Sequence, residues 1–139
     1  LYLYQNQISD ISPLAGLSSL SRISLFSNQI SDIRPLTGLT SLEELDLDIN
    51  LIRDLSPLAG LTSLSRLSIF SNQISDIRPL AGLTSLEELG LQNNQISDLS
   101  PLVGLTSLKE LWLKGNPLDK EARKNIILKL KKNGVDVSY

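Results

Sequence analysis

An asparagine recurs every 22 residues along almost the whole of this chain. The six copies are Asn6, Asn28, Asn50, Asn72, Asn94 and Asn116. A fixed period of this length means that one short structural unit is stacked on itself, so that each unit contacts mainly its neighbours. The period therefore decides the fold class before composition is considered.

Each asparagine holds the same place in an apolar frame. Two consecutive copies of that frame read Leu20, Ile23, Leu25, Asn28, Ile30 and Leu42, Leu45, Leu47, Asn50, Ile52. The spacing, L-x-x-L-x-L-x-x-N-x-L, resembles the signature of leucine-rich repeats. Its L-x-L pair predicts a short strand with both leucines facing inward, and stacking aligns these strands into a parallel sheet. The asparagine side chain is expected to bond backbone groups of the next turn and so to form a ladder.

The other half of each repeat reads SDISPLAGLSSL in the first copy. It predicts a short helical turn on the convex side, with Pro13 at the first helical position, Ser12 as its cap and Gly16 at its end. Arg34 and Arg78 replace this serine in two repeats. There the aspartate two residues earlier is the alternative acceptor for backbone amides.

The period stops after residue 118, and residues 119–139 predict a C-terminal cap. Asp119 is the expected helix cap and Gly134 the expected helix end. Apolar residues at helical spacing form one face of this helix: Ala122, Ile126, Ile127 and Leu130. Val135 and Val137 predict an edge strand. The division is thus residues 1–118, with about six repeats, and residues 119–139, a lid over the last repeat.

No matching cap is predicted at the start of the chain. The residues expected to form the exposed end of the core are Leu1, Leu3, Ile8, Ile11 and Leu14. An exposed apolar end predicts either further repeats upstream or end-to-end self-association.

The repeat consensus N-x-I-x-D-I/L-x-P-L-x-x-L-T resembles that of the bacterial internalin family. It is also similar to the wider class of 22-residue repeats that includes phosphatase-regulating subunits. The resemblance covers residues 1–118. It implies an α/β leucine-rich-repeat solenoid, right-handed and horseshoe-like, whose concave parallel sheet binds proteins. It also implies a cell-surface or secreted protein. The chain departs from internalins in lacking their helical N-terminal cap, and no internalin contact residue is transferred to it.

Composition argues against several classes of function. The chain has no cysteine and no histidine, so it lacks disulfides, thiolate metal ligands and the commonest general base. Its net charge of −2 provides no basic footprint for nucleic acid. No apolar run approaches the length of a membrane span. We therefore predict no cofactor, no metal and no catalytic residue.

Residues between the inward leucines form columns on the concave face. The first column is Tyr2, Ser24, Asp46, Ser68, Gly90 and Trp112, and the second is Tyr4, Phe26, Asp48, Phe70, Gln92 and Lys114. A flanking column is Arg22, Glu44, Arg66, Glu88 and Glu110, which predicts cross-strand charge pairing. Five of the six aromatic residues lie in the first two columns. Aromatic residues grouped on one face are typical of a protein-binding surface, although they are also good strand formers.

The third repeat breaks an otherwise copied sequence. Residues 12–44 and 56–88 differ at only four positions, whereas residues 45–55 read LDLDINLIRDL. The departures are the acidic pair Asp46 and Asp48, the apolar Ile49 and Leu51, and Arg53 in place of serine. The acidic pair between two phenylalanines would suit a basic group of a partner. Drift at a tolerant position is the alternative, and a carboxylate pair for calcium or acid–base chemistry is a weaker one.

The sequence thus predicts a module that binds a protein partner on its concave face. The predicted contact residues are Tyr2, Tyr4, Phe26, Asp46, Asp48, Phe70, Gln92 and Trp112. The main alternative is a structural scaffold or idealised repeat array without a ligand of its own.

Overall fold

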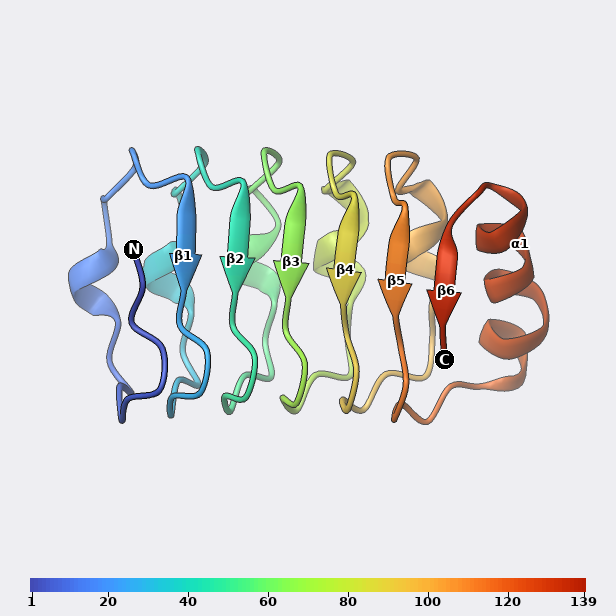
Figure 1. The fold of residues 1–139 in the computed structure, drawn as a ribbon, viewed down its shortest axis with the longest axis horizontal. Coiled ribbons are helices and arrows are strands. Elements are labelled where there is room, and N and C mark those ends of the chain that lie inside the picture. The colour runs from blue at the N-terminus through green and yellow to red at the C-terminus, as the bar shows by residue number, and fades with distance from the viewer.

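The computed structural model describes residues 1–139 as one parallel sheet backed by short helical turns (Figure 1). The strands are β1 (Arg22–Ser24), β2 (Glu44–Asp46), β3 (Arg66–Ser68), β4 (Glu88–Gly90), β5 (Glu110–Trp112) and β6 (Asp136–Ser138). They lie in chain order, each parallel to the next. Tyr2 extends the sheet by one bridge to Ser24. The predicted leucine-rich-repeat solenoid is confirmed.

Five 3₁₀-helical turns cover the opposite side of the solenoid. They are η1 (Ser12–Leu14), η2 (Arg34–Leu36), η3 (Ser56–Leu58), η4 (Arg78–Gly82) and η5 (Ser100–Gly104). Each has its proline in the first two positions, where a missing N–H leaves no bond unmade. The predicted short helical turns are therefore present in all five repeats that have this half.

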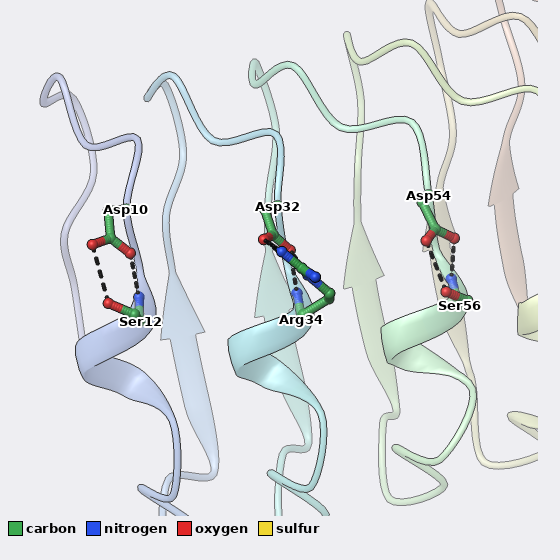
Figure 2. A network of polar contacts seen from close by, with 6 residues as sticks. All are labelled: Asp10, Ser12, Asp32, Arg34, Asp54 and Ser56. Atoms are coloured by element: carbon green, nitrogen blue, oxygen red, sulfur yellow. Dashed lines mark hydrogen bonds and ion pairs between the residues drawn. The ribbon is translucent and has the colours of Figure 1, made fainter.

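The predicted cap of these turns is wrong in one respect. Ser12 lies inside η1, and the acceptor is Asp10, whose Oδ1 receives the Ser12 backbone N–H at 2.8 Å (Figure 2). The Ser12 hydroxyl donates to the other oxygen of Asp10 at 3.0 Å. An aspartate reaches the amide two residues on without distorting the chain, so it takes the position ahead of the serine. Asp32 receives the Arg34 N–H at 2.9 Å in the same way.

The arginine-bearing turns add an ion pair to this arrangement. The Arg34 guanidinium donates from Nε and Nη2 to the two oxygens of Asp32, the shorter contact being 2.6 Å (Figure 2). These side-chain bonds, with the backbone bond, hold the pKa of Asp32 at about 2, and Arg78 does the same for the pKa of Asp76. The Ser12 backbone N–H also lowers the pKa of Asp10.

The asparagine ladder is present, but it bonds the preceding turn. Asn50 Nδ2 donates to the Leu25 carbonyl at 3.1 Å, and its Oδ1 accepts the Ile30 N–H at 3.0 Å. The backbone next to Asn50 is hydrogen-bonded to the following repeat, since the Ile49 N–H donates to the Phe70 carbonyl at 2.8 Å. The Asn50 side chain bonds the preceding repeat instead. The predicted structural role is confirmed and the predicted direction is wrong.

The C-terminal lid forms as expected. A π-helical turn (Ala122–Ile126) runs into α1 (Ile127–Lys132), and Asp119 Oδ1 accepts the Ala122 N–H at 2.7 Å. Gly134, at φ +90°, follows the helix, and β6 then pairs with β5. The apolar face predicted for this helix is buried, except that Ile126 is half-buried. No helix is long and apolar enough to cross a bilayer.

The opposite end of the solenoid is more closed than predicted. Leu1 is 40% exposed, but Ile11 and Leu14 are buried, contrary to expectation. Both belong to the second half of the first repeat, where η1 packs on η2. Leu17 is the exposed residue there instead, at 45%. The predicted end-to-end association stays a prediction.

Candidate functional site

The predicted columns are adjacent across the sheet. In the first column Ser24, Asp46, Ser68, Gly90 and Trp112 are successive partners of the parallel pairing, and Tyr2 precedes them. From Ser24 onward the inward neighbours are buried core leucines or isoleucines, so the residues of these columns lie on the outward surface, here called the sheet face. The fold thus brings residues from six repeats onto one continuous surface.

The aromatic residues of the sheet face differ in how accessible they are. Tyr2 and Tyr4 are 68% and 54% exposed, whereas Phe26, Phe70 and Trp112 are half-buried. A half-buried ring covers neighbouring strand surface and still presents an edge to solvent. The two tyrosines are the rings that a partner would reach most easily.

A shallow hollow of about 310 Å³ lies on the sheet face at its N-terminal side. Its lining residues come from the first four repeats and are Tyr2, Tyr4, Arg22, Ile23, Ser24, Glu44, Leu45, Asp46, Arg66 and Ser68. It combines two phenol rings, two arginines and two carboxylates. Such a mixed lining suits an amphipathic side chain, with an apolar stem and a charged end.

Ion pairs along the flanking column border this hollow. Arg22 approaches Glu44 at 3.4 Å and Arg66 approaches Glu88 at 2.7 Å, as the alternating charges predict. Each arginine side chain is more than half exposed, so these pairs contribute little to stability and are free to rearrange. Glu110 follows Glu88 in this column and forms no ion pair. Lys109, beside it in the chain, pairs with Glu87 of the neighbouring repeat at 2.7 Å.

The acidic pair of the third repeat is held by the sheet itself. Asp46 Oδ2 accepts the Ser24 hydroxyl at 2.9 Å. Asp48 receives the Ser68 hydroxyl at 2.7 and 2.9 Å on its two oxygens and the Phe70 backbone N–H at 2.7 Å. Asp48 therefore does structural work that sequence reasoning missed, since it binds the next strand.

Burial of Asp48 raises its pKa above the ordinary range, against the lowering effect of the hydrogen bonds from Ser68 and Phe70. Asp46, two residues earlier in the chain, raises the pKa of Asp48 further by a smaller repulsion. The two carboxylates thus point to different neighbours. The structure contains no group of three or more acidic residues arranged to hold a metal ion.

Gly90 keeps space open for two other polar groups. A Cβ at this position would lie 2.9 Å from Ser68 Oγ and 3.3 Å from Gln92 Oε1. Trp112 is in register with Gly90, and the side-chain atoms nearest to such a Cβ belong to Ser68 and Gln92. Gln92 Oε1 is buried there without a hydrogen-bond partner. This glycine therefore permits the Ser68 hydroxyl to reach Asp48.

The hollow contains only part of the predicted set. Tyr2, Tyr4 and Asp46 line it, whereas the other five predicted contact residues lie elsewhere on the sheet face. The arginines and Glu44 were read only as charge pairs. Their place in the flanking column, directly beside the column of Tyr2 and Asp46, was the signal that could have added them.

Comparisons with known proteins agree with this geometry. The family model described as leucine rich repeats (2 copies) matches residues 1–38, 18–60, 40–82, 62–102 and 84–122. No curated protein sequence matches the chain.

Solved structures give close matches over nearly the whole chain. An internalin, internalin F of Listeria monocytogenes, is 44% identical over 99% of this chain with a TM-score of 0.93, and internalin C2 of the same organism is 40% identical over 95% with a TM-score of 0.85. A leucine-rich-repeat protein of Leptospira interrogans is 29% identical over 100% with a TM-score of 0.89. The chain spans 39%, 59% and 37% of these three chains.

Proposed function

The chain belongs to the leucine-rich-repeat family and is internalin-like, and on this premise we propose that it binds a protein partner on its sheet face. The family supports protein–protein interaction in general terms. The two tyrosine rings that line the hollow of the sheet face are the observation that favours this face, because the larger hollow of about 480 Å³ on the helical-turn side contains no aromatic ring.

The chemistry of the hollow suggests a basic side chain of the partner as its occupant, because Arg22 and Arg66 are already paired with glutamates whereas Asp46 forms no ion pair. The rings of Tyr2 and Tyr4 would contact the aliphatic stem and attract the cation, and Asp46 would accept its hydrogen bonds. Asp48 would act indirectly, by fixing the strand beside the hollow. Half-buried Phe26 and Phe70 would extend the apolar contact along the sheet. The proposal assigns the chain recognition and no catalytic step.

A displayed random-peptide library selected against the full chain tests this proposal. Selected clones should contain lysine or arginine and should bind the double variant Tyr4→Ser with Asp46→Ser at least about tenfold more weakly, since exposed interface anchors commonly contribute more than 1 kcal/mol. Serine occurs in the Asp46 column at positions 24 and 68, and Tyr4 is an exposed ring outside the core, so this variant should fold normally.

The matched control is Leu128→Ser, which removes an apolar side chain of the cap helix that is 51% exposed. It should leave binding unchanged. Clones that bind the sheet-face variant as well as the wild type would contradict the proposal.

A structural spacer is the second candidate, and the copied block of residues 12–44 and 56–88 is the observation that favours it. Replacing residues 45–55 by the sequence of residues 67–77 discriminates the two. The spacer predicts unchanged stability and no change in any selected binding, whereas the recognition proposal predicts weaker binding.

A further inference from the structure

We infer a second binding surface on the loop edge of the third repeat, separate from the sheet face. It takes a peptide segment of a protein partner that presents one carboxylate beside an aliphatic side chain. The residues that form it are Ile49, Leu51, Arg53 and Gln73, and together they are here called the repeat-three edge. The inference goes beyond the sheet-face proposal and does not depend on it.

Two exposed apolar side chains mark the repeat-three edge. Ile49 is 41% exposed and Leu51 is 47% exposed, and neither joins the core cluster. Their column neighbours in the adjacent repeats are serine and glutamine: Ser27 and Ser71, and Gln29 and Gln73. The third repeat thus replaces two polar side chains by apolar ones where the core does not need them.

The backbone at Ile49 strengthens this argument. Its φ is +52°, in the left-handed region that a β-branched side chain rarely adopts. The equivalent Ser27, Ser71 and Asn93 share this conformation, so the fold demands it at every repeat. Isoleucine is a poor choice there for folding, and its exposure means that packing does not compensate. A contact with another molecule would account for it.

Arg53 supplies a charge without an internal counter-ion. The other four arginines of residues 1–110 form ion pairs: Arg22 with Glu44, Arg34 with Asp32, Arg66 with Glu88 and Arg78 with Asp76. Arg53 forms none, and its only hydrogen bond runs from Nε to Gln73 Oε1 at 2.7 Å. The neighbouring Asp54 is occupied by Ser56, which donates its backbone N–H and its hydroxyl, each at 2.8 Å.

Three of the four edge residues, Leu51, Arg53 and Gln73, line one hollow, and Ile49 lies outside it. A depression of about 400 Å³ is lined by Ser31, Leu51, Arg53, Asp54 and Gln73. Gln73 orients the guanidinium, whose fork matches a carboxylate, and Leu51 offers apolar surface beside it. Asp54 in the same hollow would repel a second negative charge, so the fit is to one carboxylate and not to an acidic run.

The probe that tests this inference is an acetylated and amidated pentapeptide, Ser-Leu-Glu-Leu-Ser, titrated into the isotope-labelled full chain and followed by amide chemical shifts. Saturable shifts are expected at residues 49–53 and at Gln73. The counterpart with glutamine in place of glutamate should bind about fivefold more weakly, because an exposed ion pair accounts for roughly that factor.

Two variants assign the contributions of the edge. Arg53→Ser restores the residue found at positions 31 and 75 and should abolish the difference between the two peptides. Leu51→Gln restores the residue found at positions 29 and 73 and should weaken both peptides equally. Because both replacements occur naturally in the neighbouring repeats, neither should prevent folding.

Two control variants show whether a loss of binding is specific to the repeat-three edge. Arg34→Ser removes an arginine that is already paired with Asp32, and Tyr4→Ser alters the sheet face; both should leave the affinity unchanged. The inference is overturned if residues 49–53 show no saturable shifts, if both peptides bind equally, or if Arg34→Ser weakens binding as much as Arg53→Ser. Loss of binding in Tyr4→Ser alone would overturn it too, while supporting recognition on the sheet face.

Discussion

Residues 45–55 and residues 67–77 fold alike from different sequences. Each supplies a strand, a residue with positive φ, a buried ladder asparagine and an aspartate before a helical turn. Apart from two inward exchanges of leucine for isoleucine, they differ at outward positions, where the third repeat has Asp46, Asp48, Ile49, Leu51 and Arg53 in place of Ser68, Phe70, Ser71, Gln73 and Ser75. The inward leucines and the asparagine are therefore sufficient for the fold, and the outward side chains are available for recognition.

The largest predicted effect tests what the two segments share. Asn50→Leu and Asn72→Leu should each lower the free energy of unfolding by at least about 3 kcal/mol, because several buried backbone groups would lose their partners. Asn50 and Asn72 are 6% and 9% exposed and make the same set of bonds. Urea denaturation measures both variants.

Asn6→Leu is the matched control for the ladder. Asn6 is exposed, and it bonds only the carbonyls of Leu3 and Tyr4 in its own repeat, at 3.2 and 3.0 Å. Its replacement should cost less than about 1 kcal/mol. Losses at Asn50 and Asn72 that differ by more than the cost of Asn6→Leu would show that the third repeat does not share the common frame.

The contrast between the two segments also explains which parts of the fold could be predicted from the sequence. The 22-residue period, the strands, the helical turns and the C-terminal lid all follow from local patterns, and the structure has them. Ile11 and Leu14 were misplaced because burial at the first repeat depends on how η1 packs on η2. Such packing is a property of two repeats together and has no signature in one.

The candidate site was harder to predict for a related physical reason. The columns of the sheet face follow from the period, but the partners within them do not. Asp48 bonds Ser68, 20 residues away, and Gly90 leaves room for that hydroxyl. Pattern alone could not distinguish a carboxylate held by the next strand from one free to bind a partner.

A smaller effect should separate the segments at the left-handed position. Ile49→Asn should raise the free energy of unfolding by about 1 kcal/mol, because asparagine tolerates this conformation better than a β-branched residue. Asn93 already occupies the equivalent place at φ +51°. The control Ser71→Asn should change stability by no more than about 0.5 kcal/mol. Equal gains in the two urea titrations would mean that Ile49 is not strained.

The smallest effect concerns the helical turns, where repeats two and four have Asp–Arg and repeat three has Asp–Ser. The pKa of Asp32 and that of Asp76, about 2, lie below the ordinary carboxyl value of about 3.9. A carboxyl whose pKa is lowered by folding stabilises the protein above the unfolded value, and this stabilisation is lost as pH falls from about 4 through about 2. Stability should therefore fall less steeply in this window for Arg34→Ser with Arg78→Ser. The reduction should be partial, because serine still offers the backbone N–H that lowers the pKa of Asp10.

Ser56→Arg supplies the opposite test, since it would give repeat three the pair that its neighbours have. This variant should lose stability more steeply than the wild type as pH falls from about 4 to about 2. The measurement is the urea midpoint of unfolding at pH 5, 3 and 2. Added salt should reduce both differences, because these pairs are exposed and screened. Parallel plots of stability against pH for the wild type and both variants would contradict this prediction. They would show that arginine and serine at these positions have the same effect on the stability of the turns.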